Sequence, residues 1–475
     1  MTAHRPATHP TVAEQVAAWL VATTPEEIPI DVVEVARRLF VDVAGLCIAA
    51  RHEPYVTATL AAVDRGGACT ALGHHGGERL RPRRAEDGEG GFDVFGAALI
   101  NGTAAHGEDY DDTFEGGPVH SGAVVVPAVL AICEREGLGG DRLLVGIATG
   151  AELLCRLSLV APTATHKAGF HPTAVFGTLA AAGAVGSALR LPPSALASAL
   201  GIAGSMASGI IEYLAEGTWT KRMHAGWAAQ SGVRAALMAR GGFVGPRTVF
   251  EGVHGVYRAF APSVNPDFEH LLDGLGSRWT MRTIAFKPYA CGTMTQPFID
   301  CAIRLADAGI RSADIASMLC EVGEGTVHRL WEPLAAKHRP PTPYAAKFST
   351  PFCMALGFLE RSAGLAQFTE TRLHDPEVLE LAAKIRYQIN PKDEYPRKFS
   401  GHLRAALVDG TEREFRQPHL RGGEQEPLSG AELEKKFLNN AIHGGWSPAL
   451  AERLLHLSRD LFSLPNLDAL HEFRA

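Results

Sequence analysis

Residues 101–123, NGTAAHGEDYDDTFEGGPVHSGA, hold three aspartates, two glutamates and two histidines between segments that are apolar and rich in alanine. The flanking segments, residues 92–105 and 123–132, are nearly uncharged, which is typical of buried helices. A loop between two buried helices faces an interior or a cleft, where polar side chains serve a site. The stretch therefore predicts a helical domain with a functional site inside it.

Acidic and imidazole side chains are close together within this loop. Asp109, Asp111 and Asp112 fall within four residues of chain. His106 lies one helical turn before Asp109, and His120 follows a Gly-Gly-Pro turn that stops a helix. General acid–base catalysis uses such pairs, because histidine titrates near neutrality while a carboxylate can orient it or act as a base. The alternative is an acidic capping turn on a solvated surface.

The composition limits the class of protein. A chain of 475 residues, 46% apolar and 20% charged, predicts a soluble globular protein of two domains. A net charge of −7 argues against nucleic acid as the main partner. We expect no membrane segment, since no apolar run of about 18 residues occurs. Eight cysteines without a Cys-x-x-Cys pair favour a reducing compartment, so we expect a cytoplasmic protein.

The periodicity of apolar residues changes along the chain. Helical spacing dominates to about residue 260, apart from a mixed-charge segment at residues 79–91 that we expect to be a mobile surface loop. Strand patterns and helices alternate from Trp279, with Asp409-Gly410 as a hairpin turn, and helices return after residue 418 with Ser429 as a helix cap. We therefore expect a mainly α protein with a helical domain from residues 1–278 and 418–475 and an inserted α+β domain from residues 279–417.

Three further polar segments stand out from apolar surroundings. His171 comes directly before a helix of small residues, whose free N–H groups favour an anion. Lys221 and His224 immediately precede another such helix, and Lys287 follows a strand pattern before a glycine turn. Each has a plain alternative, namely a structural histidine, a solvated basic turn and a surface lysine. Together with the acidic loop they suit a small polycarboxylate ligand and proton transfer.

Several known motifs are matched only in part. Asp109 to Thr113 reads DxDxT, as in haloacid-dehalogenase-type phosphatases, but it follows a helix where that motif ends a strand. Asp111 to Glu115 reads DDxxE, as in the magnesium site of helical terpenoid synthases, but the second metal motif of those enzymes is missing. The chain also lacks G-x-S-x-G, G-x-G-x-x-G, the Walker A loop and the ligand spacing of zinc or iron–sulfur sites. We expect neither a metal nor a cofactor.

Four motifs in order give the chain a family resemblance: NG..AHGEDYDDTF with PVHSGA, GFHPTAVFGTLAAA, GTWTKRMHAGWAAQSG and FKPYACG. It resembles the MmgE/PrpD family, which includes 2-methylcitrate dehydratase, cis-aconitate decarboxylase and iminodisuccinate epimerase. The resemblance implies a large helical domain, an inserted α+β lid, a homodimer and a cofactor-free site in the cleft between the domains. The site residues that it implies are Asp109, Thr113, His120, His171, Lys221 and Lys287, with His224 and Cys291 as substrate-binding neighbours.

The function implied is a metal-independent lyase that removes water or carbon dioxide next to a carboxylate of a di- or tricarboxylate. His120 would be the principal acid–base group, Asp109 and His171 would complete a proton relay, and Thr113 would bind substrate. Lys287 would belong to the lid, and the other five site residues to the helical domain. An epimerase or isomerase is the rival within the family, and a magnesium-dependent synthase or a non-catalytic carboxylate-binding protein are rivals outside it. The Lys-Pro-Tyr-x-Cys-Gly segment and Phe352 depart from the expected pattern, so the substrate stays open.

Overall fold

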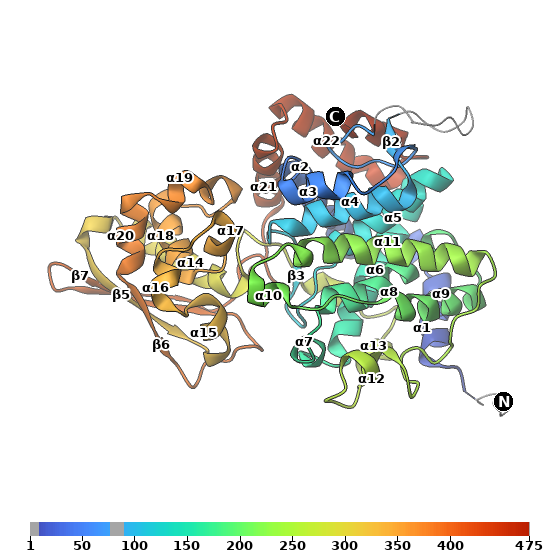
Figure 1. Cartoon of the computed structure of the whole chain (residues 1–475), viewed down its shortest axis with the longest axis horizontal. Coiled ribbons are helices and arrows are strands. Elements are labelled where there is room, and N and C mark those ends of the chain that lie inside the picture. Colours follow the sequence, from blue (N-terminus) through green and yellow to red (C-terminus); the bar gives the residue numbers. More distant parts are fainter. Residues whose placement is uncertain (1–8, 77–89, 475) are drawn as a thin grey trace. The chain divides into compact units, whose positions relative to one another are not determined.

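The computed structural model describes residues 9–76 and 90–474 and is mainly helical, as expected (Figure 1). Contacts divide it into two compact units. The large unit comprises Met1–Gly107, Gly116–Ile284 and Phe437–Ala475, and the small unit comprises Glu108–Glu115 and Ala285–Lys436. The boundaries expected from composition were residues 279 and 418. Of the expected loop at residues 79–91, residues 79–89 lie outside the described ranges.

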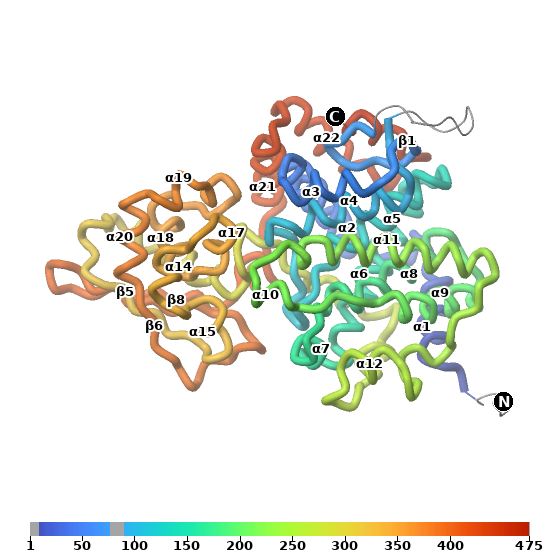
Figure 2. Tube along the Cα trace, viewed as in Figure 1, coloured from blue at the N-terminus to red at the C-terminus, as the bar shows by residue number. Residues whose placement is uncertain are grey.

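Helices form nearly all of the large unit. Those described are α1 (Val12–Ala22), α2 (Ile30–Ala49), α3 (Pro54–Leu60), α4 (Val94–Gly107), α5 (Gly122–Glu136), α6 (Gly140–Leu159), α7 (Ala164–Lys167), α8 (Pro172–Ala188), α9 (Pro193–Met206), α10 (Tyr213–Glu216), α11 (Thr220–Arg240), α12 (Val256–Phe260), α13 (Glu269–Leu272) and α22 (Pro448–Asp460). The trace in Figure 2 shows the carboxy-terminal α22 returning to the amino-terminal helices, and α22 packs on α2.

Glycines let the central helices of the large unit approach closely. A Cβ atom on Gly102 of α4 would lie 2.5 Å from the Cα of Gly226 in α11. One on Gly226 would lie 2.2 Å from the carbonyl oxygen of Leu99, so neither position has room for a side chain. Because the two backbones touch, His106 at the end of α4 comes near His224 at the beginning of α11, and the charge of His106 acts on the pKa of His224.

Two expectations for the helical region were wrong in detail. The region is not entirely helical, because β1 (Arg65–Gly67) pairs antiparallel with β2 (Gly91–Phe92), and strands this short leave no alternating pattern in the sequence. Helix α11 begins at Thr220, so Lys221 lies in its first turn and His224 at the start of its second turn, and neither lies in a loop before it. Burial of Arg222 against the ring of Tyr55, 4.4 Å from its centroid, favours that start despite the helix dipole.

The small unit contains a four-stranded sheet in the order β6-β5-β7-β8. Strand β5 is parallel to β6 and antiparallel to β7, and the β7–β8 hairpin turns at Asp409-Gly410, as expected. The strands are β5 (Ile315–Val322), β6 (Ile385–Ile389), β7 (Gly401–Leu407) and β8 (Glu412–Gln417). The helices are α14 (Gln296–Asp307), α15 (Glu324–Leu330), α16 (Leu334–His338), α17 (Pro343–Ala346), α18 (Thr350–Glu360), α19 (Glu370–Leu373) and α20 (Pro376–Ala383).

Helix α14 packs on β7 and β8 and on α18, which gives the unit its α+β character. The strand expected before Lys287 is reduced to β4 (Ile284–Ala285), preceded by a 3-10 turn at Thr280–Thr283. Helix α21 (Gly430–His443) is capped by Ser429 as expected: the Ser429 hydroxyl accepts from the Glu432 N–H at 3.3 Å, and the Glu432 carboxylate accepts from the Ser429 N–H at 2.8 Å. Among the residues that the structure describes, no helix combines the length and the apolarity needed to cross a bilayer.

Candidate active site

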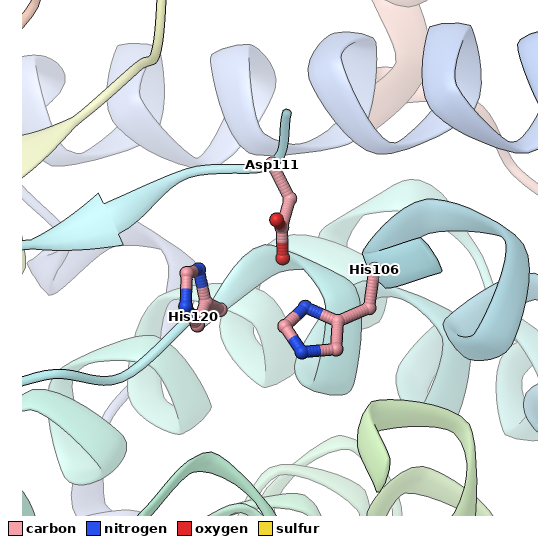
Figure 3. A group of neighbouring side chains, drawn as sticks. All are labelled: His106, Asp111 and His120. Atoms are coloured by element: carbon pink, nitrogen blue, oxygen red, sulfur yellow. The ribbon is translucent and has the colours of Figure 1, made fainter. Parts of the chain in front are cut away.

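Four histidines of the large unit, His106, His120, His171 and His224, form a buried group that we call the histidine cluster. Each lies near the end of a helix: His106 in the last turn of α4, His120 just before α5, His171 at the N-cap of α8 and His224 near the start of α11. The ring centroids of His106 and His120 are 4.8 Å apart, and Figure 3 draws these two rings together with Asp111 of the small unit. His106 also stacks on His171 with centroids 5.5 Å apart.

Burial keeps part of the histidine cluster uncharged. Loss of hydration lowers the pKa of His171 well below its usual value, and the neighbouring His106 and His224 lower it further. The pKa of His224 is lowered to about 4, chiefly by burial and then by the charges of His106 and Lys221. Both rings are therefore neutral near pH 7, with one nitrogen of each able to accept a proton.

His171 and His224 share a hydrogen bond between like atoms, with their Nδ1 atoms 3.1 Å apart. One Nδ1 must donate and the other accept, so the two neutral rings hold opposite tautomers. Moving the proton across this bond leaves the donor ring without a proton and gives the acceptor ring two. A relay along the bond is therefore complete only if the donor ring takes up a proton at its Nε2 and the acceptor ring releases one from its Nε2. Tyr213 of α10 lies against both rings, with its centroid 5.8 Å from that of His224 and 6.4 Å from that of His171.

Asp109 is held in the small unit by two side chains that the sequence places far away. The Lys287 ammonium lies 3.4 Å from Asp109 Oδ1, and the Tyr344 hydroxyl donates to Oδ2 at 3.3 Å. Lys287 is only 2% exposed, so it is not the surface lysine of the plain alternative. Asp109 has a left-handed backbone with φ of 57°, an uncommon conformation for a residue with a side chain that is often found at functional sites.

The contacts also correct the domain assignment of two site residues. Asp109 and Thr113 were expected in the helical domain, whereas the segment Glu108–Glu115 belongs to the small unit by its contacts. The reason is that side chains distant in sequence bind this segment, which composition cannot indicate. Cys291 is also buried within the small unit.

Three buried lysines of the small unit donate to three consecutive carbonyl groups. Lys347 binds the carbonyl oxygen of Glu108 at 2.9 Å, Lys287 that of Asp109 at 2.8 Å, and Lys436 that of Tyr110 at 2.7 Å. Lys347 also pairs with the Glu108 carboxylate. We call Lys287, Lys347 and Lys436 the lysine triad, and it fixes the backbone on both sides of Asp109.

Sequence reasoning selected only one lysine of this triad and overlooked Tyr344. Lys347 stands in the low-charge segment YAAKFSTPF, so the criterion that selected Lys287 would also have selected it. Lys436 lies in the charged run ELEKKF of a helix, where nothing separates a buried lysine from a solvated one. His106 was noted for its spacing but was not chosen as a site residue.

Comparison with known proteins agrees with the resemblance found in the motifs. The sequence profile of the MmgE/PrpD N-terminal domain matches residues 14–269, and that of the MmgE/PrpD C-terminal domain matches residues 289–459. The chain belongs to the MmgE/PrpD family.

Relatives of this MmgE/PrpD protein have assigned activities. Cis-aconitate decarboxylase of Aspergillus terreus (strain NIH 2624 / FGSC A1156) is 28% identical over 79% of this chain and 77% of its own length. Cis-aconitate decarboxylase of Homo sapiens is 30% identical over 73% of this chain and 72% of its own length. The cis-aconitate decarboxylase-like protein oryM of Aspergillus oryzae (strain ATCC 42149 / RIB 40) is 29% identical over 59% of this chain and 58% of its own length. With this family and these relatives, the protein is an enzyme of the lyase class.

Proposed function

We propose that this MmgE/PrpD protein is a metal-independent and cofactor-independent lyase of a small di- or tricarboxylate, removing water or carbon dioxide next to a carboxylate. The observation that carries the proposal is the neutral His171–His224 pair with its opposite tautomers, beside two further buried histidines. Proton transfer next to a carboxylate needs acid–base groups and positioned cations, which this chain supplies from its own side chains. The activity of the cis-aconitate decarboxylases also supports an aconitate-like substrate.

The roles of the residues follow from their chemistry. In a decarboxylation, the bond to the carboxylate carbon breaks, carbon dioxide leaves, and the electron pair stays on the neighbouring carbon until an acid protonates it. In a dehydration, a base removes the proton next to the carboxylate and an acid protonates the departing hydroxyl. His120 is the principal acid–base group in this proposal, because the low pKa values of His171 and His224 suit them to passing a proton and not to holding one.

The remaining site residues bind the substrate and stabilise negative charge. Asp109 completes the relay and Thr113 hydrogen-bonds the substrate, while His224 and Cys291 line its binding site. A carbanion or enediolate next to a carboxylate is stabilised by cations fixed in advance, for which Lys221 and Lys287 are the candidates. Lys221 already acts on the histidine cluster, since its charge contributes to the lowered pKa of both His171 and His224.

The purified protein should turn over at least one of cis-aconitate, citrate and 2-methylcitrate, with the same rate in the presence and absence of a chelator. Release of one carbon dioxide per turnover identifies decarboxylation, and an alkene product without carbon dioxide identifies dehydration. Epimerisation of iminodisuccinate, followed by chiral chromatography, would instead identify the epimerase. The chelator is needed because ring nitrogens of His106 and His120 lie within 4.8 Å of each other and can bind a cation. Loss of activity in chelator would overturn metal independence.

We also propose that the protein is a homodimer that uses the exposed face of α11. Trp219, Met223 and Trp227 are exposed and recur every four residues, so they lie on one side of the helix. Two tryptophans and a methionine on one face are the residue types enriched in protein interfaces, and a two-fold axis would place this face against its own copy.

Trp227→Glu should weaken the dimer about 30-fold or more, since it introduces a charge where an interface anchor of this kind contributes 2 kcal/mol or more. Light scattering after size-exclusion chromatography over a range of concentrations measures the shift. Ile30→Glu is the matched control, because it places the same charge at another exposed apolar position of the large unit. A Trp227→Glu protein that remains as dimeric as the wild type would exclude this face as the interface.

A further inference from the structure

Tyr344 is the second side chain that binds the Asp109 carboxylate, and nothing in the proposed reaction yet uses it. Its hydroxyl donates to Oδ2 at 3.3 Å, while the Lys287 ammonium lies 3.4 Å from Oδ1, so each oxygen has its own partner. We propose that Tyr344 is a positioning residue, which together with Lys287 holds the Asp109 carboxylate in the one orientation that serves the reaction. This inference rests on the proposed function for the role of Asp109.

The backbone around Tyr344 is anchored independently of Asp109. Tyr344 lies in the short helix α17, which Thr342 caps by accepting a hydrogen bond from the Ala345 N–H at 3.1 Å. The Tyr344 ring also packs edge-on against Phe348, with centroids 5.5 Å apart. The hydroxyl is therefore presented by a fixed ring and is not a mobile group that reaches Asp109 by chance.

The segment that carries Tyr344 also binds Glu108, the residue before Asp109. Lys347, directly after α17, binds the Glu108 carbonyl oxygen at 2.9 Å and pairs with the Glu108 carboxylate. Tyr344 and Lys347 thus fix a side chain and a backbone group of adjacent residues. Such a double attachment suits positioning, because backbone and carboxylate can then shift only together.

Lys287 is shared between two acceptor atoms of Asp109. Its ammonium already donates to the Asp109 carbonyl oxygen at 2.8 Å, and its contact with Oδ1 is longer at 3.4 Å. A donor at each oxygen defines the plane of a carboxylate, and the Tyr344 hydroxyl supplies the donor at Oδ2.

Replacing Tyr344 by Phe removes the hydroxyl and keeps the ring. We expect kcat to fall about tenfold or more with KM within twofold, because an Asp109 carboxylate that leaves its productive orientation stabilises the transition state less, while the bound substrate loses no contact. The acidic limb of the pH–rate profile should move to higher pH, since a carboxylate that loses a hydrogen-bond donor binds its proton more tightly. A purely structural role would leave this limb in place.

Tyr387→Phe is the matched control. The Tyr387 hydroxyl also donates to a carboxylate of the small unit, Glu332 Oε1 at 2.6 Å, but at an exposed position outside the candidate site. Its kinetic constants and pH profile should equal those of the wild type.

Crystal structures of the wild type and Tyr344→Phe separate this inference from the proposed function. The Asp109 carboxylate should have one orientation in the wild type and more than one in the variant, whether or not any tested carboxylate is a substrate. An inactive wild-type protein would therefore refute the proposed function and leave the positioning test intact. An unchanged Asp109 orientation, an unchanged acidic limb, or a rise in KM at constant kcat would each overturn the role of Tyr344.

Discussion

His120→Ala lowers kcat at least about a hundredfold, because it removes the group to which we assign the proton transfer. His120 lies beside two other imidazoles, with centroid distances of 4.8 Å to His106 and 6.3 Å to His171, so a proton that it takes up can enter the cluster. KM should change less than kcat, since the substrate carboxylates are bound by other groups. Initial rates at saturating substrate, using the carboxylate identified by the substrate comparison, measure the effect.

His74→Ala tests whether the loss of any neutral histidine that is at least half-buried has this consequence. Burial lowers the pKa of His74 to about 4, as it does for His224, but His74 is not a member of the histidine cluster. The His74 variant should keep nearly the wild-type rate once its folding has been verified by circular dichroism. A His120→Ala enzyme within threefold of the wild type would remove His120 from the mechanism.

Lys287→Met should destabilise the protein by about 3–5 kcal/mol and abolish most of the activity, because it leaves the buried Asp109 carboxylate without its cation. Both partners of this pair are at most 5% exposed, so solvent offers little compensation. Urea unfolding measures the stability, and kcat/KM measures the activity at a temperature where the variant is still folded.

The double variant Lys287→Met with Asp109→Leu separates the two effects. Replacing both charges by apolar side chains should recover most of the lost stability, while the activity should stay lost. Lys398→Met is the control, because it removes a lysine from an ion pair at the surface. Lys398 and its partner Glu394 are both exposed, so this change should lower the free energy of unfolding by less than about 1 kcal/mol. A double variant that regains activity would show that Lys287 serves only the stability of the fold.

Local pattern was sufficient for most of the fold. The hairpin at Asp409-Gly410, the cap at Ser429 and the position of His171 before α8 depend on neighbouring residues, and the structure has all three. The start of α11 at Thr220 was missed, and its buried Arg222 packs on Tyr55, which lies far away in the sequence. Propensity and periodicity carry no information about such long-range burial.

The candidate site also contains residues that the sequence could indicate and residues that it could not. Histidines and aspartates could be selected because they interrupt apolar segments, and the structure brings His106, His120, His171 and His224 together. Tyr344 and Lys436 could not be selected, since they bind residues 235 and 326 positions away. Contacts over such separations depend on tertiary structure, which one sequence does not disclose.

The lysine triad limits how the length of the segment that it binds can change in evolution. Its three ammonium groups come from three different parts of the small unit. They bind the carbonyl groups of three consecutive residues, Glu108, Asp109 and Tyr110. Exchanging a side chain at Glu108 or Tyr110 leaves these backbone bonds in place. Inserting or deleting a residue within this segment would move at least one carbonyl out of register with its lysine. We therefore expect residues 108–110 to tolerate exchange of their side chains more readily than a change in the length of the segment.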